Sequence, residues 1–176
     1  YIQFAVWIAG VVQGDLGNSL WKKTPVYDEI AHRLPVTLEL GILAIIISLI
    51  VALPIGIYSA IRQDNLVDYL GRSFAILSIA VPGFWIGTMV IVFPSLWWGW
   101  SPPIQLIPFS EDPWGNLKMF IIPAAIMGLH SSGVVMRMTR TMMLEVLRQD
   151  YLRTAWAKGL SEKVVVMRHA LKNALI

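Results

Sequence analysis

The stretch LGILAIIISLIVALPIGIYSAI, residues 40–61, contains no charged side chain. An α-helix rises about 1.5 Å per residue, so a helix over this stretch can cross a hydrocarbon core of roughly 30 Å. Glu39 and Arg62 stand at its two ends, where ionised groups can reach lipid headgroups. The stretch therefore predicts a membrane-spanning helix over about 38–61, and it makes the chain a membrane protein.

Two further apolar stretches predict two more spans. Residues 73–110 carry no charge, but they are too long for one helix, and Trp97, Trp98 and Trp100 mark an interface where a span over 73–97 ends. The Pro-rich run that follows is expected to be a loop, and a third span covers about 119–138. The predicted fold class is all-α, a polytopic transmembrane helical bundle with its core over 35–139.

The distribution of Lys and Arg orients these spans. The whole chain has 14 Lys and Arg against 11 Asp and Glu. The loop between the first two spans carries Arg62 and Arg72, the next loop carries only Lys118, and the tail after the third span is strongly basic. Positive loops stay in the cytoplasm, so residues 140–176 are expected to be cytoplasmic and residues 1–34 external.

The external segment and the two chain ends suggest a longer protein. Thr24 and Pro25 predict the start of a short external helix that Pro35 ends. An external segment needs a membrane segment before it, and the helical pattern still runs at residues 173–176. We therefore expect one transmembrane domain that is truncated at both ends.

Prolines interrupt the first two spans, at Pro54 and at Pro82. Such breaks mark cavities in some membrane proteins and serve helix packing in others, and both interpretations stay open. His130 lies midway in the third span, either as part of a pathway or as a neutral hydrogen-bonding group. The candidate pathway residues are Pro82, Phe84, Trp85, His130 and Ser131.

The basic tail is patterned as two helices with a glycine between them. Leu144, Leu147, Tyr151 and Ala155 form one helical stripe that continues the third span and stops at Gly159, a favourable residue after a helix end. Ser161 caps a second helix, whose apolar stripe is Val164, Met167, Leu171 and Leu175. A basic hairpin could lie on anionic lipid, but the glycine joint and the small residues beside it favour a knob that fits a protein groove.

The tail, DYLRTAWAKGLSEKVVVMRHALKNALI at 150–176, resembles the EAA loop of ABC-importer permeases, in the variant of the peptide/nickel branch that includes dipeptide and oligopeptide systems. GDLGNS (14–19), RLPVTLEL (33–40), IAVPGFWIG (79–87) and MLEVLRQDY (143–151) resemble the same branch in the same order. Trp156 departs from the pattern, because the branch has Arg or Lys there.

The resemblance implies the type I importer permease fold, with residues 140–176 as the segment that couples the membrane domain to an ATPase. The implied partners are a second similar permease subunit, two cytoplasmic ABC ATPases that use ATP and Mg²⁺, an external solute-binding protein and membrane lipid, with no nucleic acid. The implied location is the bacterial or archaeal inner membrane. The residues that match the coupling motif are Arg153, Thr154, Ala155, Lys158, Gly159, Leu160, His169 and Asn173.

Chemistry of its own is not expected from this chain. It has no cysteine, its three histidines are scattered, and no phosphate-binding glycine loop occurs. We expect a non-enzyme with no bound cofactor, no catalytic residue and no metal site. The alternative is an ATPase-independent channel or secondary transporter with His130 as a proton relay. The sequence leaves the cargo open among dipeptides, longer peptides, nickel chelates and oligosaccharides.

Overall fold

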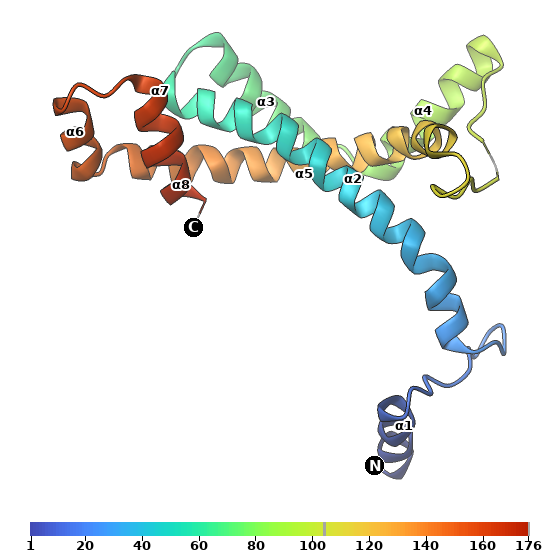
Figure 1. Ribbon diagram of the computed structural model, residues 1–176. Coiled ribbons are helices and arrows are strands. Elements are labelled where there is room, and N and C mark those ends of the chain that lie inside the picture. Colours follow the sequence, from blue (N-terminus) through green and yellow to red (C-terminus); the bar gives the residue numbers. More distant parts are fainter. Residues whose placement is uncertain (104, 176) are drawn as a thin grey trace. The chain divides into compact units, whose positions relative to one another are not determined.

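The computed structural model describes residues 1–103 and 105–175, and these residues are mainly helical (Figure 1). Within them the only strand-like pairing is an isolated bridge between Asn18 and Pro25. The chain divides into two compact units, Tyr1–Ile42 and Leu43–Ile176. The helix α2 (Val26–Ile61) contributes residues to both units.

The first unit contains α1 (Ile2–Val12), a loop and the start of α2. No residue of α1 is buried within the described chain. The loop turns at Gly14 and Gly17, whose φ angles of 86° and 77° favour glycine. Glu29, in the first turn of α2, forms ion pairs with Lys22 at 3.0 Å and with Arg33 at 3.3 Å.

The prolines of α2 do not divide it, and this corrects two expectations. The short external helix was predicted to end at Pro35, but α2 runs from Val26 through Pro35 and Pro54 to Ile61 without a break. A proline removes one hydrogen bond of the helix ladder, and the apolar turns on both sides of it retain theirs. Pro94 and Pro123 likewise lie inside helices.

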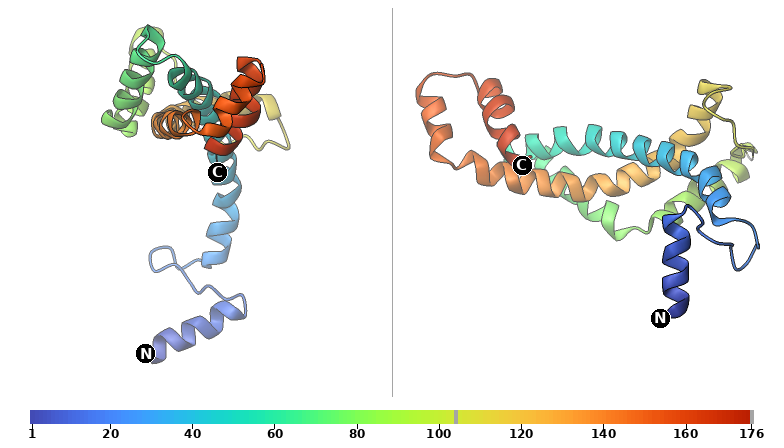
Figure 2. Two further views of the ribbon diagram at one scale, coloured as in Figure 1. Left: turned by 90° about the vertical axis from the view of Figure 1, so that its left-hand side faces the viewer. Right: turned by 60° about the horizontal axis from the view of Figure 1, so that its bottom comes forward.

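In the second unit, the C-terminal half of α2, α3 (Leu66–Ala80) and α5 (Pro113–Leu147) run side by side (Figures 1 and 2). The helix α4 (Gly83–Trp98) lies toward the N-terminal end of α5. At the other end of α5 follow α6 (Asp150–Ala157), α7 (Glu162–Val164), the π-helix η1 (Val165–Ala170) and α8 (Leu171–Ala174).

Glycine and other small residues bring the three long helices together. A methyl group added at Gly56 of α2 would lie 2.9 Å from the carbonyl oxygen of Met136 on α5, and one at Gly128 of α5 would lie 2.7 Å from the carbonyl oxygen of Ala44. A methyl group at Gly133 would lie 2.9 Å from the carbonyl oxygen of Ala75 on α3. Such close backbone approach is typical of helices that associate in lipid.

The helices agree with an all-α polytopic protein. Both α2 and α5 are long and apolar enough to span a membrane, with mean hydropathies of 2.8 and 1.7 over their best windows. The predicted second span is divided, because α3 and α4 meet at an angle of 91° around Val81 and Pro82. The break at Pro82 is thus confirmed; Val81 is extended, as the residue before a proline prefers, and Gly83 follows.

The close contact at Gly56 generates the first prediction. Replacing Gly56 with Ala should lower the free energy of unfolding by about 1–3 kcal/mol, because the added methyl group overpacks the contact between α2 and α5. The midpoint of thermal unfolding of the purified protein in detergent measures this change. Gly41→Ala on the same helix is the control, since no described atom would lie within 4 Å of its methyl group. Equal midpoints for the two variants would contradict the prediction.

Candidate functional site

The basic tail forms a helical hairpin, residues 150–175, at the end of α5. The helix α5 ends at Leu147, and Gln149, with ψ of 145°, turns the chain before α6 begins at Asp150. The prediction of one continuous helix from the third span to the glycine joint was therefore wrong. The turn redirects α6 so that Leu152 and Ala155 point into the core, while Tyr151 stays exposed.

The joint between the two arms lies where the sequence predicts it. Gly159 has a φ of 76°, which is in the left-handed region. The N–H of Gly159 donates a hydrogen bond to the carbonyl oxygen of Trp156 at 2.9 Å. The N–H of Leu160 donates to the carbonyl oxygen of Ala155 at 3.4 Å. These two bonds form a Schellman motif, which ends a helix and satisfies its last carbonyl groups. The second arm then begins after Ser161.

A single apolar core fixes both arms to the membrane helices. Leu152 and Ala155 of α6 pack with buried residues of the second arm, and the same cluster includes Met143 of α5 and Ala60 of α2. Because residues from α2, α5 and both arms share one core, the hairpin is an extension of the membrane unit. The buried residues of the second arm are Val165, Val166, Ala170 and Ala174.

This set differs from the predicted apolar stripe, in which only Leu171 packs on the core while Val164, Met167 and Leu175 are exposed. Residues 164–167 are four consecutive apolar residues, so helical periodicity could not identify the buried face. The π-helical turn of η1 also shifts the register of the residues after it relative to a regular α-helix.

Polar contacts at the surface also link the two arms of the hairpin. The side-chain amide of Asn173 donates to the hydroxyl of Tyr151 and to the carbonyl oxygen of His169, both at 2.8 Å, and the Tyr151 hydroxyl donates to the same carbonyl at 3.4 Å. Arg62, just after α2, pairs with Glu162 of the second arm at 2.9 Å. The motif residues His169 and Asn173 thus join the two arms to each other.

The outer face of α6 and the joint are free of contacts with the core. Arg153 is highly exposed and pairs only with Asp150, at 3.3 Å, among the residues that the structure describes. Ala155 differs from the other α6 residues of the motif, since its side chain is buried in the core. We call the exposed set the outer face of the hairpin: Arg153, Thr154, Trp156, Ala157, Lys158, Gly159 and Leu160.

The candidate pathway residues lie near the bend between α3 and α4. Pro82 precedes α4, and the side chains of Phe84 and Trp85 are 79% and 50% exposed. His130 and Ser131 are exposed on α5. Contacts before and after His130 and Ser131 place this part of α5 beside the bend. An added methyl group at Gly133 would touch Ala75 and Ser78 of α3. One at Gly87 of α4 would lie 3.9 Å from Ile126. The N–H of Trp85 donates to the carbonyl oxygen of Pro82 at 3.0 Å, and in the described residues no side-chain hydrogen bond joins the five candidates to one another.

Sequence reasoning missed a buried ion pair near the hairpin. Asp68 in the first turn of α3 is fully buried and accepts two hydrogen bonds from Arg140 of α5, from Nε at 2.9 Å and from Nη2 at 3.0 Å. The available signal was that Asp68 and Arg140 are charged residues of opposite sign, each located inside a helix, α3 and α5. Elsewhere in the described chain, no group of three or more metal-ligating side chains occurs.

The fold and the hairpin define a membrane protein with a jointed helical extension, and comparison identifies its class. The profile of the binding-protein-dependent transport system inner membrane component family matches residues 52–176, and the chain belongs to this family. It is 36% identical over 179 residues to the oligopeptide transport system permease protein AppB of Bacillus subtilis, which covers 100% of this chain and 57% of that protein.

Two further relatives agree. A provisionally named peptide transport system permease protein of Brucella suis is 40% identical over 175 residues, covering 99% of this chain and 56% of that protein. The dipeptide transport system permease protein DppB of Escherichia coli is 35% identical over 197 residues, covering 99% of this chain and 58% of that protein. The chain therefore spans a little more than half the length of the curated relatives it matches.

Proposed function

We propose that the chain is part of the transmembrane permease subunit of an ATP-driven ABC importer, and that its hairpin docks on a cytoplasmic ATPase subunit. The observation that carries the proposal is the apolar core that joins α6 to α5 and α2 through Leu152 and Met143. A docked segment can move a membrane pathway only if it is firmly attached to the helices of that pathway. Family membership and the named relatives support the transport role.

In this mechanism the hairpin is a lever. Its outer face, with Arg153 and Lys158 and the ring of Trp156, offers positive charge and an aromatic anchor to a partner groove. When ATP and Mg²⁺ bring two ATPases together, the docked hairpins approach each other, and the attached helices switch the pathway between its two accessible sides. Ala155, His169 and Asn173 act by positioning this face, because they lie in the core or brace the two arms.

The proposal includes the remaining partners of such a system. These are a second, similar permease subunit and an external solute-binding protein, in a bacterial or archaeal inner membrane. The cargo is a peptide, by analogy with the named relatives. The chain itself has no catalytic role, and ATP hydrolysis belongs to the ATPase subunits. No observation favours the alternative of an ATPase-independent channel or secondary transporter.

We also propose an orientation with residues 1–34 outside, 35–139 as the membrane core and 140–176 in the cytoplasm. The Lys and Arg asymmetry supports it. A cysteine at Ser110, in the exposed turn before α5, should react with a membrane-impermeant maleimide in whole cells. A cysteine at the exposed Lys163 should react only after the cells are opened. The 176 residues contain no other cysteine to interfere. Labelling in the reverse order would overturn the orientation.

The exposed aromatic residues at the bend of α3 and α4 are proposed to line the pathway. Trp85→Ala should lower peptide uptake severalfold while the complex still assembles, because a half-exposed ring contributes little to the core. Uptake of a labelled dipeptide measures the effect. Trp98→Ala, an exposed ring at the far end of α4, is the matched control. Parental uptake in the Trp85 variant would assign Trp85 to helix packing.

Docking is tested at Gly159. An added side chain there meets no atom within 4 Å, so only the left-handed φ of 76° opposes it, at a cost of about 1 kcal/mol for Ala. Aspartate tolerates this conformation at least as well as alanine. We therefore expect Gly159→Ala to be mild and Gly159→Asp to reach normal membrane levels, yet to lose ATPase co-purification and uptake. The extra loss in the Asp variant reports the desolvation of a charge at the docked surface. Normal ATPase co-purification and uptake with Gly159→Asp would refute the docking role.

A further inference from the structure

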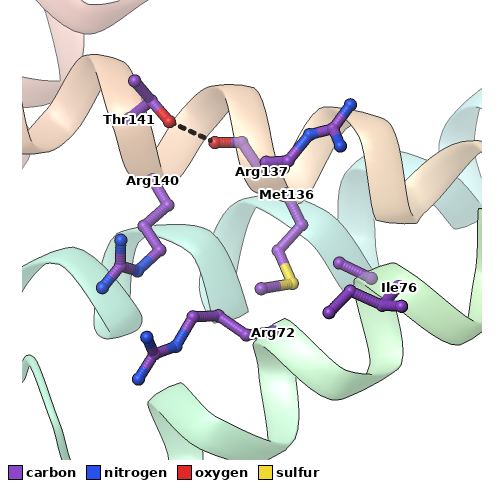
Figure 3. Close-up of a pocket in the computed structure, with 7 residues that line it drawn as sticks. Arg72, Ile76, Met136, Arg137, Arg140 and Thr141 are labelled. Atoms are coloured by element: carbon purple, nitrogen blue, oxygen red, sulfur yellow. Dashed lines mark hydrogen bonds between the residues drawn. The ribbon is translucent and has the colours of Figure 1, made fainter.

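Three arginines surround one pocket between α3 and α5. The pocket has a volume of about 200 Å³ and is lined by Arg72, Arg137 and Arg140 together with apolar side chains that include Ile76 and Met136. In Figure 3, Arg72 of α3 and Arg140 of α5 extend toward the same end of the pocket, and Arg137 lies on the other side of Met136. These arginines stand at the boundary between the apolar helices and the basic tail.

The carboxylates nearby account for only part of this positive charge. Arg140 is held by Asp68 through two hydrogen bonds. Arg72 lies 3.3 Å from Asp68 and 3.5 Å from the exposed Asp64, but its Nε and Nη2 atoms are buried and have no hydrogen-bond partner in the described part of the chain. Arg137 makes no ion pair among the described residues. The three arginines outnumber the two nearby carboxylates, so the pocket has surplus positive charge, and Nε of Arg72 has neither an ion-pair nor a hydrogen-bond partner among the described residues.

Guanidinium groups with unused N–H donors bind phosphate well, because a planar pair of donors matches two phosphate oxygens. The rest of the pocket favours a lipid over free phosphate. Ile76 forms part of its wall and is 68% exposed, and the exposed Ile79 continues the apolar surface along α3 away from the arginines. A lipid whose phosphate bound these arginines would place its acyl chains over the apolar face of α3.

We propose that the pocket between Arg72, Arg137 and Arg140 binds the headgroup phosphate of an anionic phospholipid. Arg72 and Arg137 supply the surplus positive charge, and Arg140 is held in place by Asp68. The acyl chains lie along Ile76 and Ile79. This role is independent of peptide transport and of docking to an ATPase.

The test counts lipids retained by the purified protein in native mass spectrometry. The detergent-solubilised full-length protein is titrated with phosphatidylglycerol or with phosphatidylcholine of the same acyl chains. We expect phosphatidylglycerol to be retained preferentially. Arg72→Gln and Arg137→Gln should each weaken its retention about fivefold, as expected for the loss of one basic residue near a lipid surface.

Arg148→Gln is the matched control, because Arg148 caps the same helix α5 outside the pocket. Asp68 keeps its two bonds to Arg140 in the Arg72 variant, so the fold should survive, and gel filtration checks this. Equal retention of the two lipids, or retention unchanged in both pocket variants, would overturn the proposal. Displacement of phosphatidylglycerol by equimolar inorganic phosphate would overturn the lipid proposal and assign the pocket to free phosphate.

Discussion

The close approach of α5 to its two neighbours is the contact on which the membrane unit depends. In lipid no hydrophobic force draws helices together, so van der Waals contact between backbones must do so. Gly128 lets α5 reach α2, and Gly133 lets it reach α3. Since both contacts lie on α5, this helix determines where the other two can lie. The buried pair of Asp68 and Arg140 then adds a directional contact between α3 and α5.

The same helix connects the membrane unit with the hairpin. Met143, near the end of α5, lies in the core that holds Leu152 of α6 and Val165 of the second arm. Protein interiors are tightly packed, so in the proposed importer a displacement of α6 would pass through this core to α5 and α2. The outer face of α6 is meanwhile free to bind a partner. In the proposed importer, these two faces of one short helix carry the coupling.

Local patterns in the sequence predicted the local features of the structure. The left-handed joint at Gly159 and the break at Pro82 follow from the backbone preferences of glycine and proline, and the apolar spans follow from composition. Features that depend on tertiary packing were missed. The end of α5 at Leu147 has no proline or glycine to mark it, and the helix passes through Pro35 although a break was expected. The partner of Asp68 lies 72 residues away, where no periodicity can reveal it.

The pairing of Arg62 with Glu162 joins residues that are 100 positions apart in the chain. A ribosome adds about 5–20 residues per second, so α2 waits on the order of 5–20 s in the cell for its partners in the hairpin. Until α5 is made, the small-residue face of α2, from Ala44 to Gly56, has no α5 to cover it. The order of synthesis therefore makes the nascent chain depend on surrounding lipid or on the insertion machinery until α5 has emerged.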